Sequence, residues 1–115
     1  MVAEINGRDF QREVFEADMP VLVFFISARC NTCFALGLVI NELSKEYASR
    51  IKFVKLSIEE NLEVADLYGI KALPAVLFFD KSTLIQKSFG FHYRGSLKGW
   101  LEESIGGLGE LNTPK

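Results

Sequence analysis

The chain has 115 residues, of which 49% are hydrophobic and ten are Phe. This length fits one domain with no second core, and the apolar content argues against a disordered chain. The formal net charge is −2 and Lys and Arg are scattered along the chain, which argues against nucleic acid as a partner.

The N-terminal residues and the longest apolar runs bear on location. Glu4, Arg8 and Asp9 stand where a signal peptide needs an unbroken apolar stretch. The apolar runs 21–26 and 75–79 are far shorter than the roughly 20 residues that span a bilayer. We therefore predict a cytoplasmic protein with no membrane partner, although removal of a leader or anchor would leave the same sequence.

The first half of the chain alternates predicted strands and helices. A short strand is predicted over 2–5, and Asn6 with Asp9 gives a helix start. Residues 21–26, after Pro20, are apolar throughout, as in a strand buried on both faces. After position 33, apolar residues recur at spacings of three and four up to Tyr47, which predicts an amphipathic helix of about four turns.

The second half continues this order. Residues 51–58 alternate as a strand does, and 61–68 form a helix that ends at Gly69. Two apolar stretches, 75–79 and 84–89, flank a polar turn and predict an antiparallel hairpin. A last helix reaches Ile105. The predicted domain covers residues 1–106, and residues 107–115 are predicted to be a flexible C-terminal tail.

The predicted order is βαβαβαββα, which defines an α/β fold. Strands joined by crossover helices are expected to pair in parallel, and the closing hairpin adds an antiparallel edge. The sequence therefore predicts a central mixed sheet of about five strands, flanked on both faces by about four helices.

The two cysteines, Cys30 and Cys33, lie where a buried strand ends and a long helix begins. The unpaired N–H groups at a helix N-terminus favour negative charge, which lowers the pKa of Cys30 and makes it the predicted nucleophile. Two intervening residues in the first turn bring the sulfurs within bonding reach, so Cys33 is the predicted resolving thiol.

Three other interpretations of this pair remain open. A zinc site needs about four ligands, whereas the chain offers two cysteines and His92, so no metal is predicted. A structural disulfide across so short a loop adds little stability. Two inert core cysteines are expected within an apolar pattern, whereas Arg29, Asn31 and Thr32 surround these.

Two segments resemble the thioredoxin family. PVLVFFISARCNTC (20–33) is similar to the strand that leads into the family's W-C-G-P-C site, and YGIKALPAVLFF (68–79) resembles the segment that places a cis-proline opposite the cysteines. The resemblance runs from Val2 to Ile105. It implies a thioredoxin fold and a thiol-disulfide oxidoreductase, of the protein-disulfide reductase type, that reduces or exchanges protein disulfides and maintains cell redox homeostasis. It also implies no bound cofactor, a recycling reductase as partner, and a monomer.

The resemblance assigns roles to three further residues. Pro74 is the expected cis-proline, and the backbone of Leu73 is expected to pair with an extended substrate segment. Gly90 matches the glycine that lets a loop approach the cysteines. The alternatives are a proline that merely starts a strand and a glycine that merely ends one.

The site departs from the family at several positions. Phe24 stands where the family buries an acid beneath the disulfide, and Lys55 matches the lysine beside that acid. Without the acid, the expected state of Lys55 is a solvated side chain at the strand end, and the alternative is a lysine that still perturbs the thiols. Without the acid, deprotonation of Cys33 is expected to slow. Arg29 replaces the tryptophan before the first cysteine, and Asn31-Thr32 replaces Gly-Pro. If Arg29 points inward it stabilises the thiolate further, so we predict a couple less reducing than a typical thioredoxin.

Apolar side chains are also expected near the cysteines. Phe34, Leu38 and Phe91 are candidates for a rim on which a partner docks, although core packing is an alternative. No role is predicted for His92.

Two rival functions follow from these departures. Phe24 and the lost tryptophan favour a redox-inactive protein-binding module with vestigial cysteines. An oxidase or isomerase of exported proteins would need a leader sequence.

Overall fold

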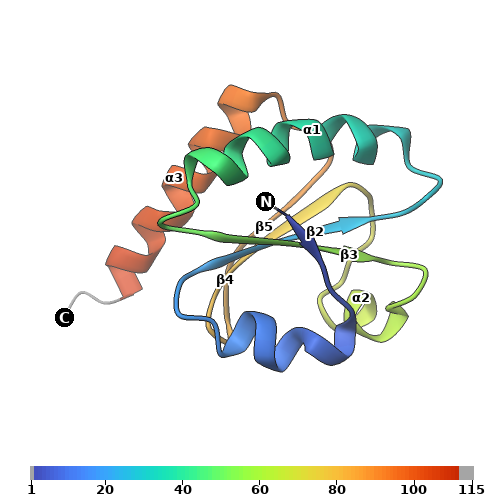
Figure 1. The fold of residues 1–115 in the computed structure, drawn as a ribbon, viewed down its shortest axis with the longest axis horizontal. Coiled ribbons are helices and arrows are strands. Elements are labelled where there is room, and N and C mark those ends of the chain that lie inside the picture. The colour runs from blue at the N-terminus through green and yellow to red at the C-terminus, as the bar shows by residue number, and fades with distance from the viewer. Residues whose placement is uncertain (1, 112–115) are drawn as a thin grey trace.

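A five-stranded mixed sheet forms the centre of the molecule in the computed structural model, which describes residues 2–111 (Figure 1). The spatial order is β1-β3-β2-β4-β5. β1 and β2 run parallel to β3, whereas β4 runs antiparallel to both β2 and β5. The strand bounds are β1 Ala3–Glu4, β2 Val21–Ile26, β3 Lys52–Ser57, β4 Ala75–Asp80 and β5 Thr83–Phe89.

Helices cover both faces of the sheet. The two long helices, α1 and α3, lie over the upper face in Figure 1, and the short helices lie below the sheet. The described helices are η1 Gly7–Asp9, η2 Gln11–Phe15, α1 Asn31–Glu46, α2 Leu62–Leu67 and α3 Arg94–Leu111. The predicted α/β class and mixed sheet are confirmed. The first predicted helix consists of a 3-10 turn followed by a π-helical turn.

Strand β2 separates two hydrophobic cores. Leu22 and Phe24 pack into the core beneath α1 and α3, whereas Val21, Val23 and Phe25 pack into the core on the opposite face. Side chains alternate between the faces of a strand, so an unbroken apolar run supplies both cores. This confirms the prediction of a central strand buried on both faces.

The orientation of β4 differs from the prediction. β4 follows a helical connection, yet it runs antiparallel to β2 rather than parallel. Residues 58–74 connect β3 to β4, and within this range only the six residues of α2 are helical. β4 starts at the end of the sheet where β2 and β3 finish, since Ala75 pairs with Phe25 and Ile26 pairs with Ser57.

The last helix is longer than predicted. α3 continues to Leu111, so residues 107–111 are helical, whereas the sequence predicts a flexible tail from residue 107. Ile105 and Leu108 pack against the upper core, and a Cβ at Gly107 would lie 3.2 Å from Ile85 of β5. The glycine thus permits close packing of the helix on the sheet rather than ending the helix. The remainder of the predicted tail, 112–115, lies outside the described residues. Within residues 2–111, no helix combines the length and apolar character needed to cross a membrane.

Candidate active site

The two sequence segments that resemble the thioredoxin family lie side by side at the end of the sheet where β2 stops and β4 begins. β2 ends at Ile26, four residues before Cys30, and β4 begins directly after Pro74. Because Phe25 pairs with Ala75, the end of one strand lies beside the start of the other. Cys30 and Leu73 both pack against the core beneath α1. The sheet topology therefore brings the cysteines and the proline segment together.

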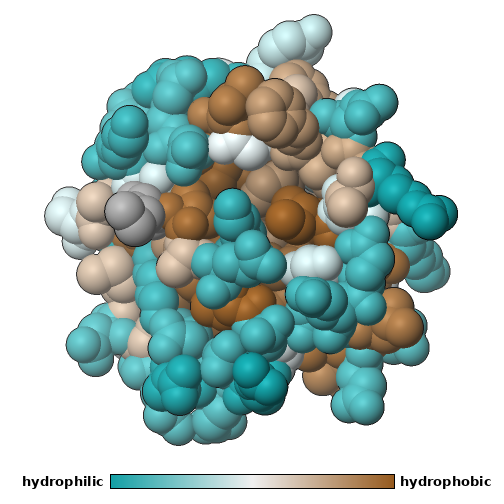
Figure 2. Space-filling model, turned by 45° about the vertical axis from the view of Figure 1, so that its right-hand side comes forward, coloured by the Kyte–Doolittle hydropathy of each residue, from teal (hydrophilic) through white to brown (hydrophobic). Residues whose placement is uncertain are grey.

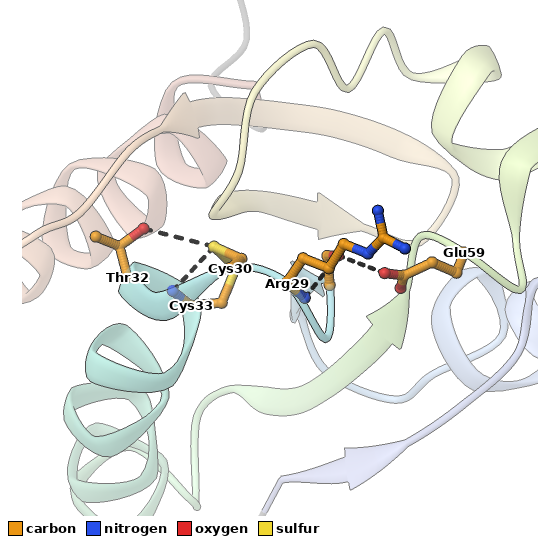
Figure 3. The surroundings of a disulfide bond; sticks show 6 residues. Arg29, Cys30, Thr32, Cys33 and Glu59 are labelled. Carbon is orange, nitrogen blue, oxygen red and sulfur yellow. Dashed lines mark hydrogen bonds between the residues drawn. A yellow bond between two sulfur atoms is a disulfide. The ribbon is translucent and has the colours of Figure 1, made fainter.

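Cys30 and Cys33 form a disulfide across the first turn of α1, with their Cα atoms 5.2 Å apart. Cys30 is the N-cap residue of α1, and its sulfur accepts a hydrogen bond from the Cys33 N–H at 3.0 Å (Figure 3). The Thr32 hydroxyl lies 3.5 Å from the same sulfur. Cys30 is half-buried, whereas Cys33 is only 4% exposed. An incoming group can therefore reach Cys30 far more readily than Cys33.

This bond contradicts the interpretation of the pair as inert core cysteines, since the two sulfurs are joined at the end of a helix. Within residues 2–111, no group of three or more potential metal ligands occurs. His92 instead lies between the hydroxyls of Ser88, at 2.8 Å, and Ser96, at 2.9 Å. Its partial burial lowers its pKa.

The proline segment has the backbone form expected from the resemblance. The Leu73–Pro74 peptide bond is cis, and the N–H of Gly90 donates to the Pro74 carbonyl at 2.7 Å. Gly90 has a φ of +96°, which favours glycine. No backbone hydrogen bond of Leu73 is found within residues 2–111. The N–H and C=O of Leu73 are therefore available to a bound chain.

Arg29 points away from the sulfur of Cys30, toward the side of the site where Glu59 lies (Figure 3). Its side chain is exposed. The condition for the predicted stabilisation of the thiolate by Arg29, an inward side chain, is therefore not met. Asn31 is also exposed, in the first turn of α1.

Sequence reasoning missed Ser27 and Glu59, which fix the loop before Cys30. The Ser27 hydroxyl donates to Glu59 and accepts from the Arg29 N–H at 3.2 Å, while Ser57 also donates to Glu59 at 3.0 Å. The hydrogen bond from Ser27 is the main cause that holds the pKa of Glu59 below its usual value. A serine directly after a buried strand is a turn signal that could have identified Ser27.

Phe24 and Lys55 lie opposite each other on β2 and β3. Phe24 is 3% exposed and Lys55 is half-buried. Both line a cavity of about 420 Å³ that also borders Cys30 and Cys33, and no Asp or Glu is among its lining residues. The position of the family's buried acid is thus occupied by an aromatic side chain on the wall of this cavity.

Exposed apolar side chains lie on α1 next to the disulfide and on the segment that follows Gly90. Phe34 and Leu38, 74% and 55% exposed, lie one helical turn apart on α1 and border the same cavity as Cys30. Phe91 follows Gly90, and its ring packs edge-on against Tyr93 at 5.0 Å. Figure 2 shows apolar surface near the top of this face, on the side where α1 lies, extending inward between polar groups. The predicted rim residues are exposed rather than core, and Tyr93 is an addition that sequence reasoning missed.

A mixed α/β sheet that places a Cys-x-x-Cys disulfide at a helix N-terminus beside a cis-proline defines a protein of thiol-disulfide exchange. The comparisons with known proteins agree. The model of the family described as Thioredoxin matches residues 1–103, and the chain belongs to this family. It is thus a thiol-disulfide oxidoreductase of the thioredoxin fold.

Several relatives carry the name thioredoxin. The chain is 34% identical to "Thioredoxin" of Rickettsia bellii (strain RML369-C), over 91% of this chain and 100% of the relative. It is 35% identical to "Thioredoxin" of Buchnera aphidicola subsp. Schizaphis graminum, over 90% of this chain and 96% of the relative. "Thioredoxin 1" of Nostoc sp. (strain PCC 7120) is 31% identical over the same shares. Family membership implies protein disulfides as substrates and a reductase as partner, and nothing here supports the redox-inactive alternative.

Proposed function

We propose that this protein acts as a reductant of protein disulfides, with Cys30 as the attacking thiolate and Cys33 as the resolving thiol. The observation that carries the proposal is the difference in access between the two sulfurs. Cys30 is half-buried at the N-cap of α1, whereas Cys33 is 4% exposed. Only the outer sulfur is placed to meet a disulfide on another protein.

The exchange proceeds in two steps. The Cys30 thiolate attacks one sulfur of the substrate disulfide, that S–S bond breaks, and the other substrate sulfur leaves as a thiolate that takes up a proton. Cys33 then loses its proton and attacks the Cys30 sulfur. The Cys30–Cys33 disulfide forms and the second substrate thiolate is released. Two electrons pass to the substrate, and a recycling reductase then supplies two further electrons that reduce the Cys30–Cys33 disulfide back to the dithiol.

The helix N-terminus supports the role of Cys30. Its sulfur accepts the Cys33 N–H at 3.0 Å and lies 3.5 Å from the Thr32 hydroxyl. Both donors stabilise negative charge on sulfur, in addition to the helix dipole.

The backbone of Leu73 is the proposed docking strand for the substrate. Its N–H and C=O have no backbone partner within residues 2–111, and the cis bond to Pro74 leads directly into β4. An extended substrate segment that paired with Leu73 would add strand-like hydrogen bonds next to Cys30. Gly90 holds this segment through its bond to the Pro74 carbonyl. We also propose that the protein works as a monomer in the cytoplasm, where a reducing partner keeps it in the dithiol form.

A redox titration and a pair of cysteine variants test this proposal. The protein is equilibrated with graded dithiol/disulfide buffers, and the redox state of the two cysteines is measured by alkylation and mass spectrometry. A reversible two-electron couple is expected. Reduced Cys33→Ser should form a stable mixed disulfide with a disulfide-containing protein such as insulin, whereas Cys30→Ser should form none.

Trapping through Cys33 in the Cys30→Ser variant would reverse the assigned roles. Thiols that stay inert over the whole buffer range would refute the reductase and point to a binding module. Exchange in the oxidising direction only would identify an oxidase instead.

A further inference from the structure

The cavity beside the disulfide lies between α1 and the sheet edge that carries β1 and β3. Val2, Lys55 and the first half of α1 contribute to its walls, and Cys30 and Cys33 border it. Its volume of about 420 Å³ falls within the range of about 300–1,000 Å³ typical of small-molecule sites. The proposed thiol exchange involves only the two sulfurs at the border of this cavity and assigns no role to the space behind them.

The walls of the cavity are largely apolar. Phe24 and Ile26 line it from the sheet, and Phe34 and Leu38 line it from the helix. Gly37 lines the cavity between these walls, and a Cβ built there would be in ordinary van der Waals contact with the Phe24 ring, at 3.7 Å. A glycine inside a helix costs about 1 kcal/mol relative to alanine. This helix therefore carries a locally unfavourable residue at a position that lines the cavity.

Lys55 is the cationic residue among those that line the cavity. Lys55 is half-buried, and within residues 2–111 its ammonium group makes neither an ion pair nor a hydrogen bond. Glu4 is the register partner of Lys55 across β1 and β3, but it is exposed and does not line the cavity. The side-chain amides of Asn31 and Asn41 add possible donors, and no carboxylate lines the cavity.

We propose that this cavity binds a small organic carboxylate whose aliphatic or aromatic body lies between Phe24 and Phe34 and whose charge is paired with Lys55. The apolar body of the ligand covers apolar lining side chains that are otherwise in contact with water. A carboxylate provides the counter-charge that the cavity lacks, and the amide donors fix its orientation. The ligand occupies the side of the disulfide that faces α1 and β3, distinct from the Leu73 backbone proposed for substrate.

A pair of matched probes tests the charge. The disulfide form of the protein, labelled with ¹⁵N, is titrated with 4-phenylbutyrate and with its neutral amide, and amide shifts are followed by NMR. A ligand of this size is expected to bind with a dissociation constant of about 1 mM. The carboxylate should bind about fivefold more tightly than the amide, with shifts confined to the cavity residues. In Lys55→Met the carboxylate should lose this advantage, while the affinity for the amide stays the same.

A second pair of variants tests the space. Gly37→Leu fills the cavity with a good helix former and should weaken both probes about tenfold or more. Gly99→Leu is the matched control, because Gly99 is exposed on α3 and a Cβ there meets nothing within 4 Å. It should leave both affinities unchanged.

Equal affinity of the two probes for the unaltered protein would overturn the proposal, as would a carboxylate preference that survives Lys55→Met. Shifts located away from the cavity would also overturn it. If Gly37→Leu fails to fold, the comparison of the probes in Lys55→Met still decides. The titration uses the disulfide form and needs no thiol exchange, so a negative result leaves the proposed reductase function untouched.

Discussion

The Thr32 hydroxyl lies 3.5 Å from the Cys30 sulfur, and Thr32→Val tests its contribution because valine keeps the side-chain shape and lacks the hydroxyl. A hydrogen bond to a charged group contributes about 1.5–3 kcal/mol. Thr32 is exposed and the contact is long, so we take about 1 kcal/mol, below that range. Loss of the donor destabilises the thiolate, and hence the dithiol form relative to the disulfide. Since 30 mV corresponds to about 1.4 kcal/mol, the potential should fall by about 20 mV.

Two assays measure this change. The redox state is titrated in dithiol/disulfide buffers, and the alkylation rate of Cys30 is followed against pH. The alkylation profile should move to higher pH by about 0.7 unit, because one unit corresponds to about 1.4 kcal/mol. Thr83→Val, the same substitution at an exposed position at the start of β5, should change neither value. A Thr32→Val potential equal to or above that of the unaltered protein would refute the role of the hydroxyl.

Three further predictions concern buried groups and backbone. Burial, aided by a 2.5 Å hydrogen bond to Glu102, raises the pKa of Tyr47 to about 12. The resulting stabilisation, about 2–3 kcal/mol, is complete below about pH 10 and lost as pH rises toward 12. Urea unfolding followed by the single tryptophan should show this decline, and a decline of equal size in Tyr47→Phe would contradict it. Phe24→Asp places a base on the cavity wall and should speed resolution of the mixed disulfide about tenfold, at a stability cost of about 3 kcal/mol; stopped-flow rates no faster than those of Phe24→Asn would rule this out. Gly90→Ala should lower stability by about 1 kcal/mol, because φ is +96°, whereas Gly95→Ala in α3 should not lower it. Thermal unfolding that ranks the two variants alike would show that φ at this position carries no cost.

Much of the fold is predictable because single strands carry clear patterns. The apolar run 21–26 defines β2 without error, since every residue in it serves one of the two cores. The direction of β4 is not predictable in this way. It depends on the end of the sheet at which the chain enters β4 after α2, and the local pattern around α2 does not carry this information. Gly107 shows a related limit, because a glycine that permits close packing resembles one that ends a helix.

The candidate site also has parts that the sequence predicts and parts that it does not. Cys30 and Pro74 are predictable because each adjoins a strand end, so the sheet alone brings them together. The bonds of Ser27 to Glu59 and the direction of Arg29 depend on side-chain conformations in a loop, which sequence spacing does not fix. The cavity is lined by residues of α1, β2 and β3, so it forms only when the helix packs on the sheet, and sequence spacing does not predict it.

Two of the departures from the family pattern, Arg29 and Phe24, concern different steps of the exchange. Arg29 points toward Glu59, so stabilisation of the Cys30 thiolate rests on the Cys33 N–H and on Thr32 rather than on the guanidinium. The first step, attack by Cys30, therefore retains its helix N-terminal support. The second step differs, because Cys33 is 4% exposed and the adjoining cavity offers Phe24 in place of an acid. Its proton must leave through water, so we expect the mixed disulfide to outlast that of a relative with the buried acid. If the second step is slow and the first step is as fast as in such a relative, the mixed disulfide should accumulate in the protein without substitutions.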